Sequence, residues 1–555
     1  MKFSKIFKTT AVALGAVVAL SGCIRETFPK EGTITQGQLM AGQMEVVAEN
    51  LLKGIPSGLL TYISGWEHTD FGYHSVGIYN DHACGLITSN GHLLGLPAGY
   101  DRFYLAAYSW SYAPNGNMPA HVWYNYYPQI KSCNDLIKVL EGNEQLKHYS
   151  GIARTYRAML YLDLARMFEC LPAANDNNPD YFADQLSVAG LTVPIVDETL
   201  DEAGAKENPR ATREQIFNFI FADLAFAEEA LAEYVPTMFS NPDLSVVYGL
   251  YARAYLWLGG FDDMYSGELP KGNDAYAKAG EYARKAIEAH GGAIMSEAEW
   301  TSVANGFNVV ASSWMWGLQQ SVDTVINNLF QFVAHMAPEA SYGYAPLSQL
   351  GVSAKDYDRL GDGDFRKKLI KGPETTYAEF APYTSLSADE FASFAPYVNF
   401  KFRPAGGNRT EYKAAGATVL PLMRCEEMYF IEMEAAYHTQ GFDAALTLLS
   451  SFMSNRDSSY RVQTQDLLDE IIFQKGIEFW GEGIKMYDMK RLNKGYDSAY
   501  NGTNYPPDAR FVIEGRAPWW SYCIPKGETD LNKAAAEQGA NPNPSQAFDP
   551  ILPME

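Results

Sequence analysis

The sequence predicts a mainly α-helical protein in which pairs of helices form a scaffold for a second lobe rich in loops and aromatic side chains. Three observations lead to this fold class. Apolar residues recur at the i, i+3, i+4, i+7 spacing of a helix in at least five segments. Some of these segments follow one another across short glycine turns, which is typical of tetratricopeptide-like helix pairs. The stretches between the helices are long and rich in Gly, Pro, Asn and aromatic residues.

Each predicted helix carries one apolar stripe. In chain order the stripes are Tyr156, Leu160, Leu164 and Met167; Phe217, Ile220, Phe221 and Leu224; Ala279, Tyr282, Ala283 and Ala286; Phe442, Ala445, Leu446 and Leu449; and Leu468, Ile471, Ile472 and Phe479. The second of these helices is preceded by Thr212 with Gln215 three residues later, the pattern of a capping box. The runs 244–258 and 275–290, which flank Gly259-Gly260, predict two helices joined by a turn.

The chain divides into these helical stretches and the irregular stretches between them. We expect the scaffold at about residues 117–292 and 424–492, and the loop-rich lobe at about 54–116 and 293–423. Loops and short strands are also expected over 172–211 and 495–555. Together these parts would form one domain that begins at Cys23.

The N-terminus has the organisation of a bacterial lipoprotein signal peptide. Lys2, Lys5 and Lys8 precede a short apolar stretch, and Leu20-Ser21-Gly22-Cys23 reads as a lipobox. We therefore expect residues 1–22 to be removed and Cys23 to carry a lipid, which anchors the chain without a transmembrane helix. The alternative is an ordinary secreted protein with an incidental cysteine at this position.

Composition excludes some functions and favours others. A formal net charge of −23 argues against nucleic acid, whose phosphates the protein would repel. The chain has 36 tyrosines and 10 tryptophans, whose flat rings can stack on sugars or peptides. The remaining cysteines lie far apart and indicate neither a disulfide framework nor a metal site: Cys84, Cys133, Cys170, Cys425 and Cys523.

Two polar clusters resemble metal sites only superficially. His68, His74 and His82 have spacings that fit no compact zinc motif, although Asp70 and Asp81 lie among them. The second cluster lacks the glycine and glutamate of a calcium loop, and it consists of Asp356, Asp358, Asp362 and Asp364. No phosphate loop, nucleophile elbow or catalytic triad motif is apparent. We therefore predict no catalytic residues, no metal site and no cofactor.

The most specific motifs lie near the C-terminus. One consists of Arg424, Glu427, Tyr429, Ile431, Glu434 and Ala435; the next of Glu478, Glu482, Gly483, Lys485, Tyr487, Asp488 and Arg491; and the last of Ile524, Pro525 and Asn532. Earlier segments add Trp123, Tyr124, Ile130 and Asn134, then Arg157-Ala158 and Leu171-Pro172, then residues 252–256 with Gly259. In this order they resemble the SusD/RagB family of outer-membrane nutrient-binding lipoproteins of Bacteroidetes, over nearly the whole mature chain. The sequence departs from the family pattern at Met433, Gln474, Lys475 and Lys485.

Glu478 and Glu482 are four residues apart, which would place both carboxylates on one face of a helix. Both need cationic neighbours, and Lys485, Lys490 and Arg491 are the nearest candidates along the chain. Paired networks of this kind more often stabilise a structure than catalyse a reaction. We interpret these residues as a structural charge network.

The resemblance implies a protein that captures a glycan at the cell surface and passes it to a SusC-like TonB-dependent transporter in the outer membrane. A peptide-binding lipoprotein like RagB and a surface glycoside hydrolase, which needs only two carboxylates, are the alternatives.

The resemblance further implies that the ligand site is built from two loop stretches. There we expect Trp66, Tyr100, Tyr104, Tyr342 and Tyr344 as stacking rings, and Arg102 as a hydrogen-bond donor. Four other tryptophans lie in apolar contexts and are expected in the core: Trp110, Trp123, Trp314 and Trp316.

Overall fold

The computed structural model describes residues 44–61, 68–96, 114, 116–172, 179–261, 266–462, 464–510 and 512–544. Contacts between residues divide the chain into a unit of residues 1–50 and a compact unit of residues 51–555, and the description below concerns the second. Cys23 and its signal sequence lie outside the described residues. No described helix is both long and apolar enough to cross a membrane.

The described helices differ greatly in length. The long ones are α3 (Met44–Leu59), α4 (Tyr73–Ala83), α6 (Asn117–Val139), α7 (Lys147–Phe168), α10 (Arg213–Ala230), α11 (Leu244–Gly259), α12 (Gly272–His290), α20 (Cys425–Gln440), α21 (Phe442–Met453) and α22 (Leu467–Glu478). The shorter ones are α8 (Pro179–Ser187), α9 (Glu202–Ala205), α13 (Glu297–Trp300), α14 (Phe332–Met336), α15 (Ala345–Ser348), α16 (Ala354–Arg359), α17 (Tyr377–Phe380), α18 (Ala388–Ala392), α19 (Tyr412–Gly416), α23 (Lys485–Arg491), α24 (Lys526–Leu531) and α25 (Lys533–Gln538). The predicted mainly α fold class is therefore confirmed.

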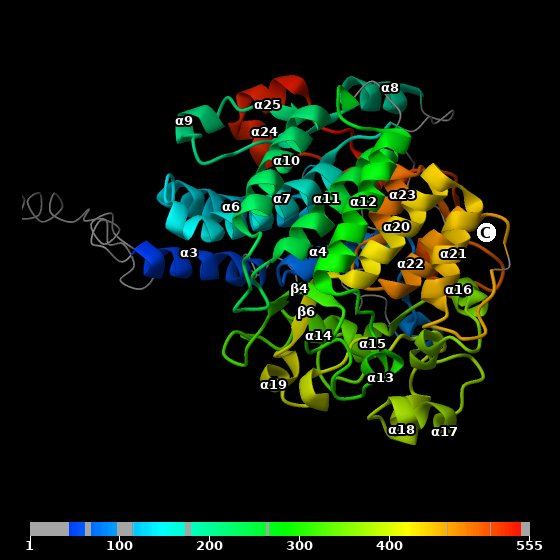
Figure 1. Ribbon diagram of the computed structural model, residues 1–555. Coiled ribbons are helices and arrows are strands. Elements are labelled where there is room, and N and C mark those ends of the chain that lie inside the picture. The colour runs from blue at the N-terminus through cyan, green and yellow to red at the C-terminus, as the bar shows by residue number, and fades with distance from the viewer. Residues whose placement is uncertain are drawn as a thin grey trace, which may run out of the picture. The chain divides into compact units, whose positions relative to one another are not determined.

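The long helices form an array in which each packs on the next. Along it α6 contacts α7, α7 contacts α10, α10 contacts α11, and α11 contacts α12. The next neighbour of α12 is α20, which in turn contacts α21 and α22. Figure 1 shows this array as a row of neighbouring helices, with the short helices α13, α14, α15, α17, α18 and α19 gathered below it in that view.

The loop-rich segment is an insertion between two helices that touch. Helix α12 ends at His290 and α20 begins at Cys425, so the chain leaves the array and returns to the same place. Strands β4 (Trp314–Gln319) and β6 (Val419–Arg424) pair antiparallel at the base of this insertion, with Trp314 opposite Arg424 and Gln319 opposite Val419.

Three other short pairings tie distant segments together. Strand β1 (Thr88–Ser89) pairs with β5 (Leu350–Gly351), which joins an early loop to the inserted segment. The others are β2 (Leu191–Pro194) with β3 (Arg210–Thr212) and β7 (Tyr496–Asp497) with β8 (Val512–Ile513). The described sheets thus hold loops in place, while the helices form the framework.

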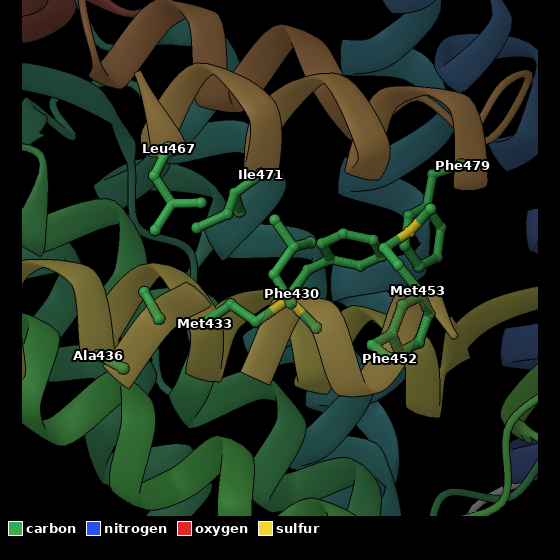
Figure 2. Close-up of a cluster of buried hydrophobic side chains, with 10 residues drawn as sticks. Phe430, Met433, Ala436, Phe452, Met453, Leu467, Ile471 and Phe479 are labelled. Atoms are coloured by element: carbon green, nitrogen blue, oxygen red, sulfur yellow. The ribbon is translucent and has the colours of Figure 1, made fainter. Parts of the chain in front are cut away.

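One apolar core lies where α20, α21 and α22 meet (Figure 2). Phe430 and Met433 of α20 face Phe452 and Met453 of α21, and Ile471 of α22 closes the cluster. All five side chains are buried, as their helical spacing requires of a stripe that faces neighbouring helices. Burial of a side chain of this size contributes about 1.5–3 kcal/mol.

Several local predictions from the sequence, for a helix cap and for buried tryptophans, are confirmed. The Thr212 hydroxyl accepts from the Gln215 amide and the Gln215 side chain accepts from the Thr212 amide, so the predicted capping box at α10 is confirmed. Trp123, Trp314 and Trp316 are buried as predicted, whereas Trp110 lies outside the described residues. The five described cysteines, Cys84, Cys133, Cys170, Cys425 and Cys523, are buried free thiols.

Two structural expectations were wrong. Residues 73–83 form helix α4 inside a stretch predicted to be irregular. Most of α4 is buried, including polar residues such as Asn80 and Asp81, so it shows no amphipathic stripe in the sequence. Glu478 and Glu482 do not share a helix either, because α22 ends at Glu478 and the chain turns through Gly481 and Gly483 at positive φ.

Candidate functional site

The structure describes two of the six side chains predicted to bind the ligand. Trp66, Tyr100, Arg102 and Tyr104 lie outside the described residues, as does the lipidation site Cys23. Tyr342 and Tyr344 lie in the turn between α14 and α15. Both are half-buried.

Tyr344 is the centre of a cluster of rings, which we call the Tyr344 cluster: His68, Phe330, His335 and Tyr344. The rings of His68 and Tyr344 stack with centroids 5.4 Å apart, and the Tyr344 hydroxyl shares a hydrogen bond with Nδ1 of His68. His335 lies 5.3 Å from Tyr344, and Phe330 meets His68 edge-on at 5.2 Å. Such a cluster combines apolar ring faces with polar tips that can form hydrogen bonds.

His335 fixes one side of this cluster. Its Nε2 donates to the carbonyl oxygens of His68 (2.9 Å) and Leu329 (3.0 Å). Because carbonyl oxygens only accept, Nε2 carries a proton. Its ring also stacks on Phe71 at 5.4 Å. Neither histidine was predicted as a site residue, because His68 had been weighed only against metal motifs and nothing in the sequence singled out His335.

Tyr342 packs against neighbouring residues of the inserted segment. Its ring packs on Val333, Ala337 and Ala340, and its hydroxyl donates to Oε1 of Gln331 at 3.4 Å. Burial raises the pKa of Tyr342, so the hydroxyl stays protonated and can act as a donor. Much of this ring therefore supports the turn that presents Tyr344.

The turn itself depends on a glycine and on a buried ion pair. Gly343 has φ of 78°, and a Cβ there would lie 2.6 Å from the carbonyl oxygen of Ala334. Just before the turn, buried Glu339 pairs with Arg403 and accepts from the Ser385 amide at 2.7 Å. Burial alone would raise the pKa of Glu339, but the Arg403 charge and these hydrogen bonds hold it below its usual value.

Glu478 and Glu482 lie in a buried charge network. The Glu478 carboxylate accepts from Arg456 (2.9 Å), Arg366 (3.2 Å) and Arg424 (3.3 Å). Although burial opposes ionisation, the arginines hold the pKa of Glu478 well below its usual range. Glu482 accepts from Arg424 and from Nζ of Lys401 at 2.6 Å.

The cationic partners predicted for these glutamates were wrong. Lys490 donates to backbone carbonyls and Arg491 pairs with Glu434 and Asp488, so neither meets Glu478. The actual partners come from elements far away in sequence, which the local spacing could not reveal. The network joins the helical array to the inserted segment, which fits its predicted structural role.

A small cavity lies beside this network, lined by Tyr73, His74, Asp163 and Arg253 among others. Its volume of about 50 Å³ has room for a few water molecules but not for a sugar. His74 contacts the Pro421 carbonyl oxygen, and burial lowers its pKa to about 4. The cavity is therefore not the ligand site.

The two clusters that resemble metal sites have other partners. Asp81 accepts from the amides of Gly481 (2.8 Å) and Gly483 (3.1 Å), and Asp364 pairs with Arg366. Within the described ranges, no three His, Cys, Asp or Glu side chains are placed to hold a metal ion together.

The comparisons with known proteins agree on the fold and on the family. Two family models match the chain, one described as starch-binding and associating with the outer membrane (residues 101–256) and one as the SusD family (residues 340–538). A search of curated protein sequences finds no significant match.

Solved structures with the same fold cover most of the chain. A SusD-like carbohydrate binding protein from Bacteroides vulgatus superposes with a TM-score of 0.64 at 22% identity, covering 89% of this chain and 97% of its own. A SusD superfamily protein from Bacteroides thetaiotaomicron gives 0.63 at 20% identity, with 90% and 99% covered. Surface glycan-binding protein A from Bacteroides fluxus gives 0.61 at 15% identity, with 92% and 100% covered.

The array of paired helices with a lobe inserted between α12 and α20 defines a helical-repeat scaffold protein of the SusD-like class. The matching family models support the same assignment from sequence. This chain belongs to the SusD/RagB family.

Proposed function

We propose that this protein is a cell-surface lipoprotein that captures a glycan and delivers it to a SusC-like TonB-dependent transporter in the outer membrane. The observation that carries the proposal is the Tyr344 cluster, in which half-buried Phe330 and Tyr344 and buried His335 of the inserted segment meet His68 of the first loop. Trp66 precedes His68 by two residues in the sequence, so one of the predicted stacking residues of the first loop is a near neighbour of this cluster along the chain.

We propose further that residues 23–555 act as one SusD-like domain, held at the outer membrane by a lipid on Cys23. The predicted ligand residues Trp66, Tyr100, Arg102 and Tyr104 remain part of the proposal. The protein would bind its ligand without chemical change, so we propose no catalytic residue and no cofactor.

Calorimetric titration against a panel of glycans and peptides tests the binding function. We expect affinity for at least one glycan, and Tyr344→Ala should weaken it several-fold, because one stacked ring contributes on the order of 1 kcal/mol. Tyr344→Phe, which keeps the ring but loses the bond to His68, should retain most of the affinity. Tyr124→Ala is the matched control, since Tyr124 is a 45% exposed tyrosine on α6 of the scaffold.

The other outcomes separate the alternatives. Binding of peptides with no glycan affinity would favour a RagB-like peptide carrier. Shortening of oligosaccharides during overnight incubation would favour a glycoside hydrolase. Unchanged glycan affinity in a folded Tyr344→Ala variant would refute this location for the site.

A further inference from the structure

A cleft lies between α16, α22, α23 and β7. Its volume is about 320 Å³, and none of its lining residues belongs to the Tyr344 cluster. This volume is at the lower end of the range for small-molecule pockets, which begins at about 300 Å³. It would hold one or two sugar units.

The cleft is richer in cations than the rest of the protein. Four cationic side chains line it, against three aspartates: Lys355, Arg359, Lys485 and Lys494 against Asp356, Asp469 and Asp497. Their formal balance of 4 − 3 is one positive charge, in a chain whose net charge is −23. Glu470 pairs with Arg359 at 2.6 Å and offsets this charge, so an anionic group would be drawn here by individual cations that have no carboxylate partner.

The aspartates do not neutralise the cations evenly. Asp469 serves both Arg359 (3.0 Å) and Lys494 (3.7 Å). Lys485 is half-buried, and within the described part of the chain its ammonium makes no hydrogen bond and no ion pair. An ammonium without a carboxylate partner can pair with an anion that enters the cleft.

Lys485 cannot easily turn away from the cleft. A Cβ on Gly476 of α22 would lie 3.0 Å from Cδ of Lys485, so the lysine stem runs across this glycine. Lys355 also lacks a carboxylate partner among the described residues, and its ammonium lies 5.9 Å from the ring centre of Tyr500. Two cations are thus available on one cleft.

The remaining walls suit a sugar ring. The Arg359 guanidinium covers a face of buried Phe473 at 4.0 Å, whereas half-buried Tyr496 offers an aromatic edge that a sugar ring could meet. The Asp356 carboxylate makes no ion pair in the described structure and can accept hydrogen bonds from hydroxyl groups. We propose that this cleft binds a carboxylate-bearing sugar, with the carboxylate on Lys485 and the hydroxyls on Asp356.

Titration with D-glucuronate, followed by saturation-transfer NMR, tests the proposal on the full mature protein. We expect D-glucuronate to bind about ten-fold more tightly than its methyl ester, because the ester cannot form a charge-assisted hydrogen bond with Lys485. Lys485→Met keeps the stem on Gly476 and should lower the affinity by a similar factor, while Lys485→Arg should restore it. Lys278→Met, on the exposed face of α12, is the control.

Three results would overturn the assignment. They are equal binding of D-glucuronate and its methyl ester, unchanged affinity in a folded Lys485→Met variant, and binding of acetate as tight as that of D-glucuronate, which would leave no role for the sugar ring. The Tyr344→Ala variant should bind D-glucuronate like the wild type. Failure of the proposed glycan site and failure of this cleft can therefore be told apart.

Discussion

At the scale of single residues, Glu478 illustrates how a buried charge is tolerated. Its carboxylate is fully buried and meets three arginines. Glu478→Gln would leave these guanidinium groups without their shared anion, and we expect it to lower the free energy of unfolding by about 3–5 kcal/mol. Denaturant unfolding measures this loss.

The matched control for that experiment is Glu229→Gln. Glu229 is an exposed glutamate whose only described ion pair is with Lys147 at 2.7 Å. Exposed pairs contribute little, so this variant should unfold like the wild type. Equal loss in both variants, or none in Glu478→Gln, would contradict a structural role for the network.

Buried histidines predict a second property, the dependence of stability on pH. Burial lowers the pKa of His82 to about 3 and that of His74 to about 4. Unfolded imidazoles titrate near 6.5, so between roughly pH 6.5 and pH 4 the unfolded chain binds more protons, and stability falls as the pH falls. Asp81 has the opposite effect, because burial raises its pKa to about 7 and the folded protein therefore binds this proton. It offsets only one of the two protons that His74 and His82 take up on unfolding.

Denaturant unfolding at about pH 7, 5.5 and 4.5 checks this expectation. His82→Leu removes one of the titrating groups and should flatten the slope over this window. Stability that rises as the pH falls, or an unchanged slope in a folded His82→Leu variant, would show that these histidines do not control it.

At the same scale, the sequence identified residues of the charge network but not their partners. Glu478 and Glu482 were correctly interpreted as members of a charge network. Their partners Arg366, Lys401 and Arg456 come from distant segments, and only the fold brings them together. His68 and His335 were missed for the same reason, since 267 positions separate the two residues that share a hydrogen bond.

At the scale of elements, the turn between α14 and α15 decides how Tyr344 is presented. Gly343→Ala would place a Cβ against the Ala334 carbonyl oxygen, and the turn would have to open. We expect this variant to lose glycan affinity as well as some stability. Gly291→Ala separates the two effects, because Gly291 has φ of 92° but no atom within 4 Å of the added Cβ.

Gly291→Ala should therefore show only the cost of the backbone conformation, about 1 kcal/mol, and should keep its affinity for glycan. Titration and thermal melting of both variants provide the comparison. Equal affinity in both variants would mean that the geometry of this turn does not control the site.

Helices with one apolar face were predictable and the others were not. The stripes on α10, α12 and α21 contrast buried with exposed positions, and the capping box marks where α10 begins. Helix α4 is buried on most of its surface, so polar residues such as His82 stand where a stripe would require apolar ones. An apolar stripe appears in the sequence when the opposite face of a helix meets water, and little of the α4 surface does so.

At the scale of the whole molecule, the anchor proposed for Cys23 determines where the protein acts. Cys23→Ala should prevent lipidation and release the protein from membranes, because no described helix could span one. Membrane fractionation with high-salt and carbonate washes measures the release. A variant that stays in the washed membranes would refute the lipid anchor.

The insertion between α12 and α20 also bears on how the chain folds. Helices α6 to α12 follow one another along the chain, so their contacts close short loops and can form early. The contact between α12 and α20 must wait until the whole segment from residue 291 to 424 has been brought back, and the entropy of closing that loop is lost before the contact forms. Completion of the array is therefore a step of high contact order, and we expect it to be slower than the pairing of helices that are close along the chain.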